Sequence, residues 1–193
     1  MPITTLYLVR HGEADDDEAL DPSLTPLGRR QAALTGEALR TVGARAVLHS
    51  SRRRAVETAR LIASSLHDAP AQHSELLEDR TPIPDDWSSV PSRYHAYLRS
   101  VPPDEADQGA QLLTRALDEL SRIDTSDRTV VAVTHNFVIG WIVREVLDAP
   151  WWRWIGLNQA NGAITIVRWS DGRAPELVSF NEREHLRAVG DHP

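Results

Sequence analysis

Thr5-Leu6-Tyr7-Leu8-Val9-Arg10-His11-Gly12 is the stretch of sequence that says most about the fold. Residues 5–9 are β-branched, aromatic or aliphatic, which predicts a short buried strand, and Arg10 and His11 follow it at once. The same order recurs at residues 46–50 and 129–135, where apolar runs end at His49-Ser50 and at Thr134-His135. Strands that each end in polar side chains predict one sheet whose carboxyl edge carries a ligand site.

Helical patterns lie between these strands. Thr25 followed by Pro26 is typical of a helix start, because the hydroxyl can cap the helix and proline lacks an N–H that would otherwise stay unpaired. Apolar spacing predicts further helices within residues 55–66, 112–120 and 137–147, and a late strand at residues 163–169 that could lie at the sheet edge. The alternation predicts an α/β fold, a three-layer sandwich with a mostly parallel central sheet flanked by helices.

The length of 193 residues fits a single domain over residues 1–193. Between residues 78 and 111 the periodicity is lost, five prolines interrupt the chain, and Trp87, Tyr94 and Tyr97 add aromatic side chains. An aperiodic stretch of this length is more often a functional lid than a linker. We therefore expect a lid-like insertion at about residues 79–108.

Composition excludes several chemistries. The chain has no cysteine and no lysine, so disulfides, thiolate metal sites, cysteine nucleophiles and Schiff bases are impossible. The net charge of −7 speaks against nucleic acid as a partner. The sequence shows neither a signal peptide nor an apolar run long enough to cross a bilayer, so we expect a cytoplasmic protein with no membrane partner.

The polar side chains at the three strand ends form the candidate site. Arg10 and His11, the run Arg52-Arg53-Arg54, and His135 would converge at the carboxyl edge as a pocket for a dianion. Each has a simpler interpretation, since a histidine at a strand end is often structural and an arginine run is often a solvated surface. The run Trp151-Trp152-Arg153-Trp154 is more often core or subunit contact, which leaves a homodimer open.

Six segments in order resemble the motifs of the histidine phosphatase superfamily, in its phosphoglycerate-mutase-like branch. The segments are residues 8–13 (LVRHGE), 24–32 (LTPLGRRQA), 50–59 (SSRRRAVETA), 76–78 (LLE), 133–136 (VTHN) and 161–165 (NGAIT). They extend from residue 6 to about 169 when flanking strands are included. Within the family, residues 78–84 and 135–167 are most similar to its mitochondrial serine/threonine protein phosphatase and bacterial relatives.

The resemblance implies a metal-independent phosphatase that hydrolyses phosphate monoesters through phosphohistidine, without a cofactor. It assigns His11 as nucleophile, Glu78 as general acid with a raised pKa, and His135 as a protonated donor beside the phosphate. Phosphate would be bound by four further residues, namely Arg10, Arg54, Asp17 and Asn136. A backbone carbonyl is expected to fix the tautomer of His11.

The substrate would be a phosphorylated small molecule or a phosphoprotein. Two alternatives stay open, a cofactor-dependent phosphoglycerate mutase and a catalytically silent phosphate-binding module. Asp17 stands where the family often has Asn, the usual Gly-Glu-Ser is missing near residue 109, and the middle insertion is short. These departures disfavour the mutase more than the phosphatase.

Overall fold

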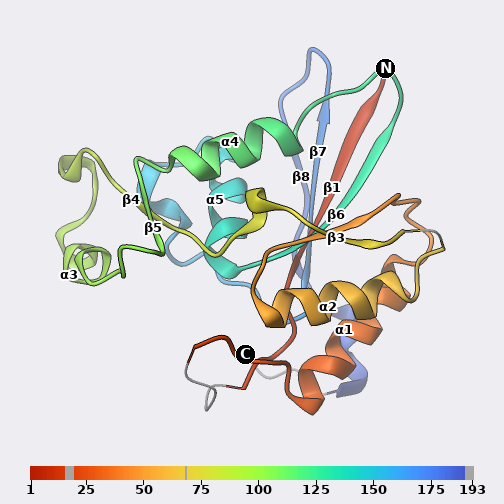
Figure 1. The fold of residues 1–193 in the computed structure, drawn as a ribbon. Helices are drawn as coiled ribbons and strands as arrows, with labels where there is room; N and C mark the ends of the chain where they lie inside the picture. The colour runs from red at the N-terminus through yellow and green to blue at the C-terminus, as the bar shows by residue number, and fades with distance from the viewer. Residues whose placement is uncertain (16–19, 68, 190–193) are drawn as a thin grey trace.

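The computed structural model describes residues 1–15, 20–67 and 69–189, and within them a six-stranded sheet forms the middle of three layers (Figure 1). The strand order is β3-β2-β6-β1-β7-β8. The strands are β1 (Ile3–Arg10), β2 (Val47–His49), β3 (Ala71–His73), β6 (Arg128–Thr134), β7 (Ile164–Ser170) and β8 (Glu176–Glu182). The first four of these run parallel, whereas β7 is antiparallel to both β1 and β8. The predicted fold class is confirmed.

Helices cover both faces of the sheet (Figure 1). One face carries α1 (Pro26–Leu39) and α2 (Arg53–Ala63), and the other carries α4 (Gln111–Leu120) and α5 (Asn136–Val146). Strand β6 shows how both faces are filled, because Val131 and Val133 join the core under α1 and α2, whereas Val130 and Ala132 join the core under α4 and α5. Its alternating side chains therefore hold two cores together.

The predicted start of α1 is confirmed. Thr25 is its N-cap and accepts a hydrogen bond from the Gly28 N–H at 3.0 Å, with Pro26 in the first turn. This turn packs against the chain that leaves β1 so closely that a Cβ on Gly12 would lie 2.4 Å from the Gly28 carbonyl oxygen. A residue without a side chain is thus required at position 12 for this close contact with α1.

Two strands of the sheet were not predicted. Strand β8 is the edge strand, so β7 lies inside the sheet, and the expectation that residues 163–169 could form the edge is wrong. Side chains of β8 are only exposed or half-buried, with Glu176, Ser179, Asn181 and Glu182 among them. Strand β3, at the other edge, is only three residues long. Edge strands with so little burial give no apolar pattern.

The segment at residues 79–108 contains a second, two-stranded parallel sheet of β4 (Thr81–Ile83) and β5 (Ala106–Gln108), and the short helix α3 (His95–Arg99). Five 3₁₀ helices complete the described elements, η1 (Glu75–Leu77), η2 (Trp87–Ser89), η3 (Ser92–Tyr94), η4 (Trp151–Trp154) and η5 (Glu184–Val189).

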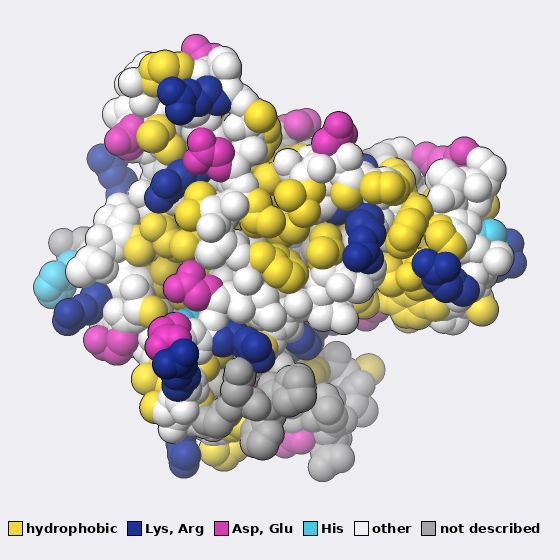
Figure 2. Space-filling view, turned by 180° about the vertical axis from the view of Figure 1, so that it is seen from behind, with side chains coloured by type: hydrophobic (Ala, Val, Ile, Leu, Met, Phe, Trp, Pro, Cys, Tyr) yellow, Lys and Arg dark blue, Asp and Glu magenta, His cyan; other side chains and the backbone are white. Residues whose placement is uncertain are grey.

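Aromatic side chains fasten this segment to the rest of the protein. The rings of Tyr94 and Trp152 lie 5.7 Å apart, and the Arg93 guanidinium lies 4.7 Å from the centre of the Tyr94 ring. From behind, hydrophobic and arginine side chains alternate on the side of the molecule that carries α3 (Figure 2). The aromatic side chains therefore anchor the segment rather than merely line a cleft.

Candidate active site

The carboxyl ends of β1 and β6 and the start of α2 meet at one pocket of about 290 Å³. Its described lining consists of Arg10, His11, Arg54, Asp79, His135, Asn136 and Phe137. Five residues predicted for the site are among them, while Glu78 is not. Asp17, the remaining predicted residue, lies outside the described residues.

His11 follows β1, and its ring contacts a backbone carbonyl group on one side and Arg54 on the other. Its Nδ1 lies 2.8 Å from the Gly12 carbonyl oxygen, so Nδ1–H donates there and Nε2 keeps its lone pair. The predicted fixing of the tautomer is confirmed. Nε2 faces the Arg54 Nε–H at 3.1 Å. Burial lowers the pKa of His11 well below its usual value, and the nearby His135, Arg54 and Arg10 lower it further despite the Gly12 hydrogen bond. The ring is therefore neutral near pH 7.

Arg54, in the first turn of α2, connects the groups of the pocket. Besides His11, its Nη2 reaches Asp79 Oδ2 at 2.6 Å and lies 3.4 Å from His135 Nδ1. Its own position is fixed through Thr58, which donates to the Arg54 carbonyl at 2.7 Å and accepts from the Gly12 N–H at 3.0 Å. One buried hydroxyl thus ties α2 to the loop of the nucleophile candidate.

His135 follows β6 and is the N-cap residue of α5. Its Nε2 lies 2.7 Å from Ser50 Oγ, its Nδ1 lies 3.3 Å from Asp79 Oδ2, and its ring centre is 5.2 Å from that of His11. Burial first, and then the charges of Arg54, Arg52 and Arg10, lower its pKa well below the usual value. The protein's own charges thus favour neutral His135, and the expected protonated form would need the negative charge of a phosphate.

Arg10 is oriented by the loop that follows η4. Its Nη1 donates to the Gln159 carbonyl, and the Gln159 N–H donates to Asn136 Oδ1 at 2.9 Å. The Asn136 amide also donates to Asn158 at 3.0 Å. Asn136 therefore lines the pocket, but its side chain is engaged in fixing the loop that holds Arg10. Burial lowers the pKa of Arg10 from its ordinary value, which is high enough for the side chain to remain a cation.

Glu78 faces away from this pocket, and its neighbour Asp79 faces into it. The Glu78 carboxylate accepts hydrogen bonds from the Ser51 N–H and hydroxyl, both at 2.7 Å, and lies 3.0 Å from His73 Nε2. Burial alone would raise its pKa, but the hydrogen bonds from Ser51 and His73 outweigh burial and lower it. The expected raised pKa of Glu78 is wrong, and the carboxylate next to the imidazoles belongs to Asp79.

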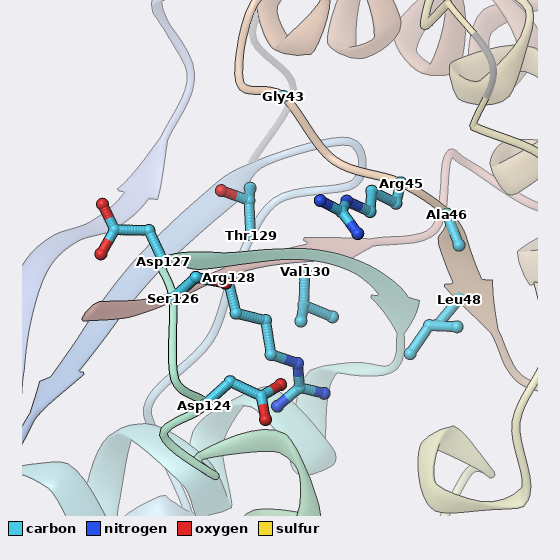
Figure 3. Close-up of a pocket in the computed structure, with 10 residues that line it drawn as sticks. All are labelled: Gly43, Arg45, Ala46, Leu48, Asp124, Ser126, Asp127, Arg128, Thr129 and Val130. Carbon is cyan, nitrogen blue, oxygen red and sulfur yellow. The ribbon is translucent and has the colours of Figure 1, made fainter. Parts of the chain in front are cut away.

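A larger cavity of about 400 Å³ lies at the opposite edge of the sheet, where β2 and β6 begin (Figure 3). Two of the charged side chains there make structural hydrogen bonds. Arg128 donates to the carbonyls of Glu119 and Leu120 at 3.3 Å, and Asp127 accepts from the Ile3 N–H at 2.9 Å. None of its ten described lining residues is a histidine, so the chemistry is concentrated at the smaller pocket.

The described part of the chain holds neither a candidate metal cluster nor a membrane-spanning helix. There, no three histidine or acidic side chains are grouped so that they could hold a metal ion. In the same residues, no helix combines the length and apolar character needed to cross a membrane.

Comparison with known proteins agrees with this geometry. Residues 6–183 match the model of the histidine phosphatase superfamily (branch 1). The mitochondrial serine/threonine-protein phosphatase PGAM5 of Mus musculus is 30% identical over 198 residues, which covers 96% of this chain and 62% of that protein. The chain thus spans less than two thirds of the length of this relative.

Solved structures share the fold at low identity. A mycobacterial glucosyl-3-phosphoglycerate phosphatase aligns with a TM-score of 0.71 and 21% identity, over 93% of this chain and 99% of its own. A phosphoglycerate mutase from Plasmodium falciparum aligns with a TM-score of 0.62 and 20% identity, over 100% of this chain and 96% of its own. Both likenesses show the fold alone.

The comparison also corrects one expectation. The curated relatives are mitochondrial phosphatases, which contradicts the expected cytoplasmic localisation. The family predicted from the six motifs is confirmed: the chain belongs to the histidine phosphatase superfamily, in the phosphoglycerate-mutase-like branch.

Proposed function

We propose that this protein is a metal-independent phosphatase that hydrolyses phosphate monoesters through a phosphohistidine at His11. The observation that best supports the proposal is the tautomer and orientation of the His11 ring. Its Nδ1–H is engaged by the Gly12 carbonyl, and its unprotonated Nε2 faces the pocket beside Arg54. A neutral imidazole with a fixed tautomer is a competent nucleophile at neutral pH.

In the first step, phosphate oxygens displace the protein partners of Arg54, and Arg10 supplies a second guanidinium. His135 donates a further hydrogen bond once the dianion favours its protonated form. The His11 Nε2 lone pair forms the N–P bond while the bond from phosphorus to the leaving oxygen breaks. Asp79, the carboxyl that lines the pocket, gives the leaving oxygen its proton.

In the second step, a water molecule attacks the phosphorus of phospho-His11. Asp79, now a carboxylate, accepts a proton from that water, and the electron pair of the N–P bond returns to Nε2. The products are inorganic phosphate and the starting enzyme. Arg10 and Arg54 stabilise the equatorial oxygens in both steps, which is where phosphoryl transfer obtains most of its catalysis.

Turnover of p-nitrophenyl phosphate in EDTA tests the reaction. We expect activity to persist in the chelator, and an alkaline quench to trap a base-stable, acid-labile phosphoryl group on His11. His11→Ala should remove both label and turnover, while Arg53→Gln, at an exposed side chain, serves as the folded control. Loss of activity in EDTA that one divalent ion restores, or label mapped to His135, would contradict the mechanism.

A further inference from the structure

Arg52 is not among the residues that line the pocket and has no part in the mechanism above. It is the N-cap residue of α2, two positions before Arg54, and its charge is close enough to His135 to contribute to the lowered pKa of that ring. The Ser51 segment before it is fixed by the two hydrogen bonds to Glu78. A third guanidinium is therefore held beside the phosphate site.

The Arg52 guanidinium is only loosely paired. Among the described residues, its ion-pair partner is Glu105, with Nη2 and Oε1 3.7 Å apart, beyond hydrogen-bond distance. Arg54 by contrast contacts Asp79 at 2.6 Å, and Arg53 contacts Glu57 at 3.3 Å. Both side chains of the Arg52–Glu105 pair are partly exposed, at 29% and 40%. Most N–H groups of this guanidinium thus remain available to a ligand.

Glu105 belongs to the segment of residues 79–108 that borders the pocket. Its carbonyl accepts from the Thr81 N–H at 2.8 Å, which fixes it where β4 and β5 begin. Tyr97 of the same segment is near enough for Glu105 and Asp79 to contribute, after burial, to its raised pKa, and its ring lies 6.3 Å from that of Phe137 in the pocket. Glu105 is thus close to both Arg52 and Tyr97, and Tyr97 in turn contacts the pocket residue Phe137.

We propose that Arg52 binds a carboxylate of the substrate and so selects phosphate monoesters that carry a carboxylate near the phosphoester. This inference rests on the phosphatase activity proposed above. A carboxylate can accept two parallel N–H bonds from the guanidinium, which is a stronger contact than the 3.7 Å pair with Glu105. A second phosphate fits less well, because its two charges would lie near Glu105 and Asp79 with only Arg52 to balance them.

The experiment compares substrates that differ only in the carboxylate. For 3-phosphoglycerate, we expect Arg52→Gln to lower kcat/KM about tenfold, as the loss of a charge-assisted contact predicts, and for glycerol 3-phosphate less than about twofold. Arg53→Gln is the matched control, since it removes a neighbouring charge that faces Glu57, and it should leave both values nearly unchanged.

A second variant tests the displacement of Glu105. Glu105→Gln removes the competing charge and should lower KM for 3-phosphoglycerate without changing KM for glycerol 3-phosphate. Phosphoserine peptides with Glu or Gln next to the phosphoserine form the other arm. A carboxylate preference confined to the peptides assigns the acidic group to a protein substrate, and one confined to 3-phosphoglycerate assigns it to a small acid.

The two proposals fail differently. If wild-type protein hydrolyses none of these substrates and no p-nitrophenyl phosphate, the phosphatase activity itself is refuted. If the protein hydrolyses them but Arg52→Gln lowers kcat/KM equally for 3-phosphoglycerate and glycerol 3-phosphate, Arg52 contributes only to the positive electrostatic potential of the pocket. The selection of carboxylates is then refuted. A rise in KM for 3-phosphoglycerate in Glu105→Gln would refute the displacement of Glu105.

Discussion

Asp79 and Glu78 are adjacent acids whose tasks the structure separates, and replacing each by its amide tests that separation. Asp79→Asn removes the carboxyl that lies 2.6 Å from Arg54 and 3.3 Å from His135. Glu78→Gln removes a carboxylate that accepts from Ser51 and His73, away from the imidazoles. We expect the first change to affect proton transfer and the second to affect chiefly the stability of the fold.

The magnitudes follow from these contacts. General acid–base groups contribute roughly 10²- to 10⁴-fold, so Asp79→Asn should lower kcat on glycerol 3-phosphate, whose alkoxide needs a proton, by about 10³-fold. Glu78→Gln keeps one oxygen acceptor for Ser51 but loses a charged one, which should cost about 1 kcal/mol of stability, or about 3 °C in Tm. Its kcat should stay within about threefold of wild type. A substitution away from the reacting groups typically changes a free energy by about 0.5 kcal/mol, and that change in the activation free energy corresponds to little more than a twofold change in rate.

Stopped-flow hydrolysis of p-nitrophenyl phosphate distinguishes the steps. Nitrophenolate leaves without a proton, so Asp79→Asn should keep a rapid burst of nitrophenolate and then turn over slowly, because water attack on phospho-His11 lacks its base. Thermal melts of both variants in the same buffer measure stability. A Glu78→Gln protein that is folded but loses the burst, beside a fully active Asp79→Asn protein, would refute the assignment and restore Glu78 as the acid.

Three further predictions concern the same pocket. Because burial and neighbouring cations lower the pKa of His11 below 6.5, kcat/KM for p-nitrophenyl phosphate should be lost only as the pH falls through that lowered pKa, and an acid limb at 6.5 or above would contradict it. Gly12→Ala should destabilise the protein by about 2 kcal/mol in a urea melt, since its Cβ would lie 2.4 Å from the Gly28 carbonyl; a stability equal to wild type would show that this contact relaxes freely. Tyr97→Ala should change the ranking of phosphate monoesters more than Tyr94→Ala, because Tyr97 contacts Phe137 of the pocket while Tyr94 packs on Trp152; equal changes in the measured kcat/KM values would argue against it.

Much of the fold could be predicted because its signals are local. The apolar run before Arg10, the Thr25-Pro26 start and the buried run before Thr134 each depend on neighbouring residues only, and each marks an element of the structure. Strand β8 could not be predicted in this way, because four of its seven side chains are exposed and its strand conformation depends on pairing with β7. Likewise, the small sheet of β4 and β5 joins segments more than twenty residues apart.

Some residues of the candidate site could likewise be predicted from the sequence, and others could not. Arg10 ends β1, and His11 and His135 directly follow the adjacent parallel strands β1 and β6, so topology alone brings them together. No comparable rule separates Glu78 from Asp79, since both follow η1 in one extended stretch and successive side chains of such a stretch point to opposite sides. Partners distant in sequence decide which carboxylate faces the pocket, because Ser51 binds the Glu78 carboxylate and Arg54 binds the Asp79 carboxylate.

The same cations that would bind phosphate also keep the nucleophile unprotonated. Burial and the charges of Arg54 and Arg10 contribute to the lowered pKa of both His11 and His135, so protonating either ring in the protein alone would place a further positive charge beside two guanidinium groups. A bound dianion offsets that charge, which lets His135 take up a proton while the hydrogen bond from Nδ1 to Gly12 leaves the His11 Nε2 lone pair directed at phosphorus. The arginines thus couple arrival of the substrate to the protonation of one histidine and the nucleophilicity of the other. Replacing Arg10 or Arg54 by a neutral side chain should therefore weaken phosphate binding and also move the acid limb of the kcat/KM profile to higher pH.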